Sequence, residues 1–105
     1  MVLKALIGLV LATAPTAQCP RVDVTWGLSS QATGYVVYRA DVTRPVSGKT
    51  LSWHNVATLP ATELEYVDMG VTTDIVYFYR VEAVGSDGKE YVIRANAVLH
   101  SCSEK

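Results

Sequence analysis

The stretch that decides the fold is Tyr77-Phe78-Tyr79-Arg80-Val81-Glu82-Ala83-Val84. Its residues alternate between two faces, the first with Tyr77, Tyr79, Val81 and Ala83 and the second with Phe78, Arg80, Glu82 and Val84. Aromatic and β-branched residues fit a half-buried strand, and the run Gly85-Ser86-Asp87-Gly88 that follows is typical of a turn. We therefore expect a strand with one buried face, continued by a hairpin into residues 90–99.

Composition excludes several classes of protein. The 105 residues suffice for one domain with a single core. Half of them are hydrophobic and 18% are charged, which excludes a disordered chain. Nine basic and ten acidic residues give a net charge of -1, and the basic residues form no cluster. The sequence therefore gives no indication of a nucleic-acid partner, and its apolar N-terminal run is too short to span a membrane.

Other segments have the pattern of short strands. Arg21–Trp26 alternates most clearly, with Val22, Val24 and Trp26 on one face. The further predicted strands are 35–39, 51–59, 63–68 and 91–99, with loops at 27–34 and 41–50 between them. Six or seven such strands predict an antiparallel β-sandwich. Its two inner faces would contain Trp26, Tyr35, Val37, Tyr79 and Val81.

The first residues allow two interpretations. One early lysine followed by residues 5–12, which are mostly apolar, is typical of a secretory signal peptide, although the sequence before Cys19 offers a poor cleavage site. Alternatively, Leu9–Ala14 is the first strand of the domain, and its removal would expose a sheet edge. We favour the strand, and divide the chain into an N-terminal segment 1–8, a domain 9–100 and a polar tail 101–105.

Five motifs occur in the order found in one known family. They are Val22-Asp23-Val24-Thr25-Trp26, Ala32-Thr33-Gly34-Tyr35-Val36-Val37-Tyr38-Arg39, Val56-Ala57-Thr58-Leu59, Tyr66-Val67-Asp68 and the stretch Tyr77–Val84. In this order the chain resembles a fibronectin type III domain of the bacterial and phage kind, from about Leu9 to Leu99. The resemblance implies an immunoglobulin-like sandwich of about seven strands, with Trp26 in the core and Tyr77 as the tyrosine-corner residue.

The chain departs from this family at two places. Thr73-Asp74 stands where the family usually has Pro-Gly before the tyrosine corner, and no Arg-Gly-Asp tripeptide follows Val84, so integrin-type adhesion has no support.

The two cysteines, Cys19 and Cys102, are too few for a zinc site without histidines at ligand spacing. They either form a disulfide or remain two free thiols. A bridge would close a loop of about 80 residues and stabilise the fold by roughly 4 kcal/mol in the chain-entropy model. The fibronectin type III topology implies that both cysteines lie at one pole of the sandwich, which favours the disulfide.

No motif for catalysis or cofactor binding is present: the chain has no Gly-rich phosphate loop, no Gly-x-Ser-x-Gly and no His-Glu-x-x-His. The carboxylates of Glu63, Glu65 and Asp68 are better explained by a solvated strand face than by a paired acid and base. We expect His54 to be an exposed residue of a connection. Asp87-Gly88 with Asp41 does not supply the oxygens of a calcium site. We therefore expect a protein that is not an enzyme and that has no cofactor and no metal.

Partner contacts could come from the outward face of the central strand. Phe78 and Val84 would form an apolar patch there, unless neighbouring side chains cover them. Ser86 and Asp87 lie in the turn that follows and are further candidates for contact with a partner.

The sequence leaves two possible functions. The one that we favour is a small phage virion accessory protein (decoration, collar or tail) that binds a larger assembly or copies of itself. The alternative is a secreted bacterial adhesion or carbohydrate-associated module. The corresponding locations are the virion and the extracellular space.

Overall fold

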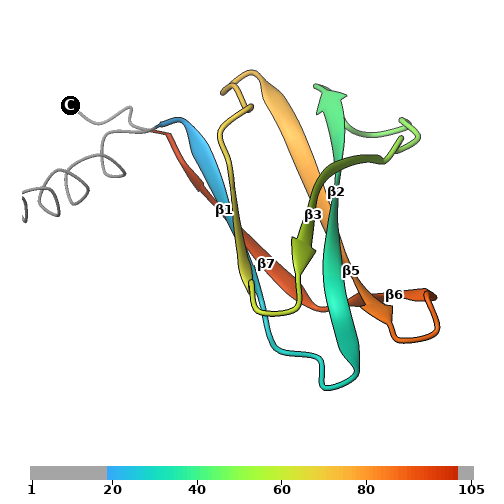
Figure 1. The fold of residues 1–105 in the computed structure, drawn as a ribbon. Helices are drawn as coiled ribbons and strands as arrows, with labels where there is room; N and C mark the ends of the chain where they lie inside the picture. The colour runs from blue at the N-terminus through green and yellow to red at the C-terminus, as the bar shows by residue number, and fades with distance from the viewer. Residues whose placement is uncertain (1–18, 102–105) are drawn as a thin grey trace, which may run out of the picture.

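The computed structural model describes residues 19–101, which form seven β-strands and no helix. The strands are β1 (Arg21–Trp26), β2 (Ala32–Thr43), β3 (His54–Pro60), β4 (Glu65–Asp68), β5 (Ile75–Gly85), β6 (Glu90–Ile93) and β7 (Ala95–His100). They form two antiparallel sheets, one in the order β4-β1-β7 and the other in the order β3-β2-β5-β6. Figure 1 shows β1 and β7 on one side of the molecule and β2 and β5 on the other. The predicted all-β sandwich is confirmed.

The two longest strands, β2 and β5, form the middle of the four-stranded sheet. They pair from Ala32↔Gly85 to Thr43↔Ile75, so each is longer than its pattern predicted. The predicted loops 27–34 and 41–50 were therefore too long at the ends that adjoin β2. Pairing with a neighbouring strand over its whole length holds β2 extended, even where its own residues alternate poorly.

The core lies between the inner faces of the two sheets. Val22, Val24 and Trp26 of β1 face Tyr35 and Val37 of β2, together with Val81 and Ala83 of β5; all seven are buried. The rings of Trp26 and Tyr35 lie 5.6 Å apart at an angle of 55°, a tilted contact that favours both rings. Tyr77 and Tyr79 are only partly buried and pack at the edge of this core.

The predicted final strand 91–99 is wrong as a single element. Residues Glu90–Ile93 pair with β5 in the large sheet, whereas Ala95–His100 pair with β1 in the small sheet. Arg94 is the residue between the two strands. A strand that switches sheets keeps its alternation, so its sequence pattern does not reveal the change of partner.

The structure shows why glycine occupies two positions in the chain. A Cβ at Gly34 would lie 2.9 Å from the carbonyl oxygen of Leu59 on the neighbouring β3, closer than side chains tolerate. Gly88 has a φ of 84°, in the left-handed region that suits glycine. It closes the β5–β6 turn, where its N–H donates to the carbonyl oxygen of Gly85.

Candidate functional site

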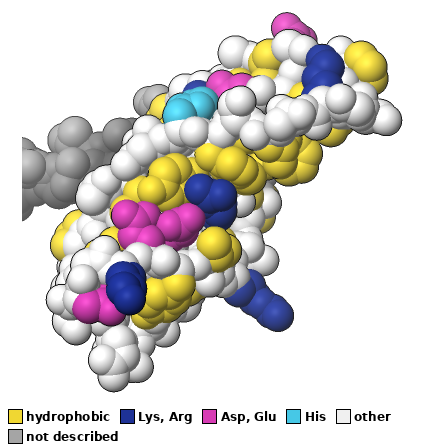
Figure 2. Space-filling model, turned by 90° about the vertical axis from the view of Figure 1, so that its right-hand side faces the viewer, with side chains coloured by type: hydrophobic (Ala, Val, Ile, Leu, Met, Phe, Trp, Pro, Cys, Tyr) yellow, Lys and Arg dark blue, Asp and Glu magenta, His cyan; other side chains and the backbone are white. Residues whose placement is uncertain are grey.

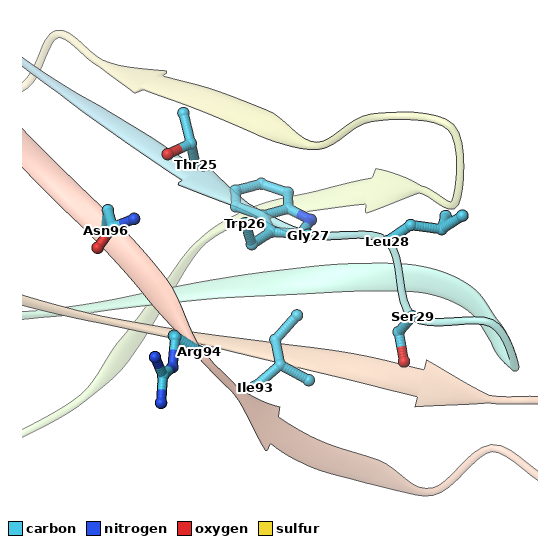
Figure 3. A pocket seen from close by; sticks show the side chains of 8 residues that line it. All are labelled: Thr25, Trp26, Gly27, Leu28, Ser29, Ile93, Arg94 and Asn96. Carbon is cyan, nitrogen blue, oxygen red and sulfur yellow. The ribbon is translucent and has the colours of Figure 1, made fainter.

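A hollow lies where β1 ends and where β6 gives way to β7. We call it the Trp26 pocket; it has a volume of about 510 Å³ and is shown in Figure 3. Its lining consists of Thr25, Trp26, Gly27, Leu28, Ser29, Ile93, Arg94 and Asn96. Pockets that hold small ligands typically measure about 300–1,000 Å³. The pocket is therefore of a size that could hold a small molecule or the end of a polymer chain.

The change of sheet at Arg94 creates this pocket. Ile93 is the last residue of β6 in the large sheet, and Asn96 lies in β7 of the small sheet, opposite Thr25 of β1. The chain therefore leaves one layer and enters the other beside Trp26. The hollow borders both sheets, because its lining combines Ile93 of the four-stranded sheet with Thr25 and Asn96 of the three-stranded sheet.

Polar groups in the pocket include one unsatisfied donor. Within residues 19–101, the buried indole Nε1 of Trp26 has no hydrogen-bond acceptor. Ser29, which also lines the pocket, forms one backbone and one side-chain hydrogen bond. Its backbone N–H donates to the hydroxyl of Tyr35 (2.9 Å), and its Oγ lies 3.1 Å from the hydroxyl of Tyr91. Buried donors are almost always paired, so the indole N–H of Trp26 is a feature that needs an explanation.

A second polar cluster lies on the outer face of the four-stranded sheet. The guanidinium of Arg80 lies between two aromatic rings, 4.7 Å from the centre of Tyr38 and 4.8 Å from that of Trp53. Its Nε also forms an ion pair with Glu82 at 3.0 Å. We call this cluster, with Glu90, the Trp53 face. Figure 2 shows acidic and basic side chains beside one another on this side of the molecule, bordered by hydrophobic ones.

Glu90 shifts the pKa of two neighbouring groups of the Trp53 face, Glu82 and Tyr38. Partial burial and a hydrogen bond with Glu90 raise the pKa of Glu82. Tyr38 donates its hydroxyl to Glu90 Oε1 at 2.9 Å, and this bond raises the pKa of Tyr38. Glycosidases hold their two catalytic carboxyl groups about 5–9.5 Å apart, on either side of the scissile bond. Here each carboxylate instead has a partner of its own, because Glu82 pairs with Arg80 and Glu90 accepts from the hydroxyl of Tyr38.

The predicted solvated face is confirmed for Glu63 and Glu65, which are exposed, but is wrong for Asp68, which is only 2% exposed. Its Oδ2 accepts hydrogen bonds from Arg39 Nη1 and from the hydroxyl of Tyr79, both at 2.8 Å, and its Oδ1 accepts from the N–H of Gly70 at 3.0 Å. Burial alone would raise the pKa of Asp68, but these three donors together hold it below its usual value. Arg39 also binds Asp41 through two nitrogens. This cluster joins β2, β4 and β5 and is structural.

Tyr77 makes a contact of the tyrosine-corner type. Its hydroxyl accepts a hydrogen bond from the backbone N–H of Thr72, five residues upstream, at 2.8 Å. The guanidinium of Arg39 lies 5.1 Å above its ring. The role that the family resemblance implies for Tyr77 thus has a matching contact in the structure.

The remaining candidate residues are distributed over the surface. Phe78 and Val84 are half-buried, so they form no open apolar patch, whereas Ser86 and Asp87 are exposed in the β5–β6 turn. His54 is exposed at the start of β3, within the predicted strand 51–59, and its Nε2 lies 3.9 Å from Asp41 Oδ1.

Several sequence predictions fall outside the described residues. Both the predicted first strand Leu9–Ala14 and Cys102 lie there, so the first strand and the Cys19–Cys102 disulfide stay predictions.

Sequence reasoning did not find the Trp26 pocket or the Trp53 face. The predicted continuous strand contains Arg94 and Asn96, and the predicted hairpin places Glu90 at the start of that strand. The one available signal was Arg94, a single cation in an otherwise uncharged run from Tyr91 to Leu99. Both sites depend on how separate strands approach one another, which no local pattern reveals.

A smaller hollow of about 240 Å³ lies at the other end of β1. It is lined mostly by apolar residues: Val22, Arg44, Thr72, Ile75, Val76, Tyr77, Tyr79, Ala97 and Leu99. Among the strands that the structure describes, β5 pairs here with β2 alone, since β6 pairs with it no further than Val81.

Two kinds of feature are missing from the part of the chain that the structure describes. Between residues 19 and 101, no three histidine, cysteine or acidic side chains lie close enough to hold a metal ion. The same residues contain no helix with the length and apolar character that crossing a membrane requires.

Comparison with known proteins gives distant matches to parts of much larger enzymes. No protein-family model matches the chain. It is 36% identical over 70 residues to an amylopullulanase of Thermoanaerobacter thermohydrosulfuricus, and 35% identical over 80 residues to one of Thermoanaerobacterium thermosulfurigenes. These alignments cover 67% and 76% of this chain but only 4% of each enzyme. The chain is thus distantly related to a short segment of these proteins.

Proposed function

We propose that this chain is a non-catalytic, carbohydrate-associated accessory module of the fibronectin type III kind. The observation that carries this proposal is the match to about 4% of each amylopullulanase. A segment that small is a minor part of such an enzyme, and it corresponds here to one β-sandwich. The name amylopullulanase denotes action on pullulan and on amylose-type glucans, so a glucan of this class is the ligand to test first.

Two observations support a role without catalysis. Glu82 is paired with Arg80, Glu90 with the hydroxyl of Tyr38, and Asp68 is buried in an ionic cluster, so none of these carboxyl groups resembles a member of a glycosidase pair. The exposed surface instead presents an open pocket and an aromatic face. The virion role, which we favoured from the sequence, gains no support from these relatives, and they favour the carbohydrate-associated alternative.

Two further features belong to this proposal, namely export from the cell and a disulfide between Cys19 and Cys102. The β1–β7 register pairs Arg21 with His100, so the described strand ends that lie two residues from each cysteine in the sequence are side by side. A disulfide at that position is consistent with an extracellular protein.

Affinity electrophoresis of the purified chain tests the proposal. We expect pullulan or amylose in the gel to slow the native protein, while a non-binding reference protein keeps its mobility. The same preparation should release no reducing sugar from either polysaccharide. Unchanged mobility in both polysaccharides would overturn the binding role, and release of reducing sugar that is lost in a folded Glu82→Gln variant would overturn the non-catalytic one.

A further inference from the structure

We propose that the Trp26 pocket binds the end of a neutral α-glucan chain, with the indole N–H of Trp26 and the side chains of Arg94 and Asn96 as the groups that recognise its hydroxyls. This inference rests on the proposed function and adds the place and mode of binding. It begins from the unsatisfied donor in the pocket.

The indole Nε1 of Trp26 is buried and has no acceptor within residues 19–101. Leaving a buried donor unpaired destabilises the protein, so a ligand oxygen that accepts this bond would recover part of the lost stability. Figure 3 shows the indole nitrogen on the end of the ring that points toward the loop of Gly27 and Leu28, which borders the pocket. The donor therefore lies beside the pocket, and a ligand oxygen reaches it once this loop moves aside.

The polar rim suits a ligand with many hydroxyl groups. Arg94 and Asn96 are exposed, and their side chains form no hydrogen bond or ion pair with other described residues. An arginine offers five donors, and an asparagine offers both donors and an acceptor, so together they can bind adjacent hydroxyls. The pocket lining contains no acidic residue and only one cation.

The apolar part of the lining suits the carbon-bound face of a sugar ring. Leu28 is 72% exposed, and Ile93 is half-buried on the opposite wall. A sugar ring has C–H groups on its faces and hydroxyls around its edge. The combination of two aliphatic walls with a rim of donors matches this division, as small-ligand pockets in general do.

The segment that covers the indole N–H has few contacts. A Cβ built on Gly27 would have no neighbour within 4 Å, and Leu28 next to it is largely exposed. Ser29 is the first residue of this loop that is anchored, through Tyr35. A small shift of Gly27 and Leu28 would thus admit a ligand oxygen to Trp26 without disturbing the core below.

The test follows the two tryptophan indole N–H signals of the full chain by NMR while maltoheptaose is added. A Trp53→Phe variant assigns the signals, since Trp26 and Trp53 are the two tryptophans. We expect the Trp26 N–H signal to move downfield, as a new hydrogen bond requires, and its hydrogen exchange to slow. Arg94→Ala and Asn96→Ala should each weaken binding about tenfold, which corresponds to about 1.4 kcal/mol.

The matched control is Arg44→Ala, which removes an exposed arginine beside the hollow at the opposite end of β1 and should leave the affinity within twofold. Cello-oligosaccharide of equal length should bind more weakly, because its β-linkages present the hydroxyls differently.

If maltoheptaose binds but moves only the Trp53 signal, and Arg94→Ala has no effect, the location is wrong while the proposed function stands. No binding of maltoheptaose or pullulan would overturn both. A response of Trp26 to inorganic phosphate but not to maltoheptaose would overturn the ligand class.

Discussion

Replacing Asp68 with asparagine removes one charge from the buried cluster and keeps the shape of the side chain. In the native protein this carboxylate accepts hydrogen bonds from Arg39, Tyr79 and the backbone of Gly70. The substitution leaves the guanidinium of Arg39 with Asp41 as its remaining partner. The asparagine amide can also turn an N–H₂ group toward the donors, so at least one hydrogen bond is lost.

The expected cost follows from burial. Removing one partner of a buried ion pair typically costs about 3–5 kcal/mol. Arg39 keeps 13% of its side chain exposed and retains Asp41, so we expect a value near the lower end, about 3 kcal/mol. For a domain of this size, that corresponds to a fall in Tm of roughly 12–24 °C. Tyr79→Phe removes only the hydroxyl donor and should cost about 1.5 kcal/mol.

The pH dependence gives an independent test. Because the folded protein lowers the pKa of Asp68, its contribution is complete above the unfolded value of about 3.9. It is lost as the pH falls below that value, since the unfolded chain then takes up the proton first. The difference in unfolding free energy between the native protein and Asp68→Asn should therefore be constant from pH 5 to 7 and should shrink below pH 4.

Urea denaturation at several pH values measures these differences. Glu65→Gln, on the exposed face of the same strand β4, is the control and should change the unfolding free energy by less than about 0.5 kcal/mol. If Asp68→Asn costs less than about 1 kcal/mol at pH 7, or if its effect is the same at pH 3 as at pH 7, the ionic role assigned to Asp68 is refuted.

Three further results are expected. Trp26→Ala should lower the unfolding free energy by about 3–5 kcal/mol in urea denaturation, because Trp26 is only 7% exposed and packs in the core. A loss of less than about 1 kcal/mol would contradict this position in the core. Reduction of a Cys19–Cys102 disulfide should lower the Tm by several degrees; an unchanged melting curve, or two reactive thiols in the native protein, would argue against the bridge. Arg80→Ala should redshift the fluorescence of Trp53 and destabilise the fold by about 1 kcal/mol, with an unaltered emission spectrum as the contrary outcome.

The local sequence was most informative where one face of a strand meets the core. The alternation in Arg21–Trp26 and in Tyr77–Val84 predicted two strands whose inward residues include Val24 and Val81, both fully buried in the structure. Alternation works there because each strand keeps one face against the core over most of its length. The all-β class and the antiparallel arrangement follow from these strands and the turns between them.

Local pattern was misleading where a residue's surroundings come from distant parts of the chain. Asp68 lies on the same face of β4 as Tyr66, opposite the exposed Glu65 and Val67, and only its charge predicted contact with solvent. Arg39 and Tyr79 arrive from two other strands and bury that charge. An isolated carboxylate could not be buried there, so its burial depends on those partners. The same holds for Arg80, whose place between two aromatic rings requires β2 and the segment before β3 to lie beside β5.

The sequence by itself determined that this chain forms a sandwich of short strands, because a two-residue period and turn-forming residues are local properties. Only the tertiary structure decided that the chain changes sheets at Arg94, and with that change came the Trp26 pocket. Either sheet could satisfy the backbone hydrogen bonds of residues 95–100, so their own sequence does not select between them. The choice depends on which neighbour is free to pair, and that is a property of the whole fold.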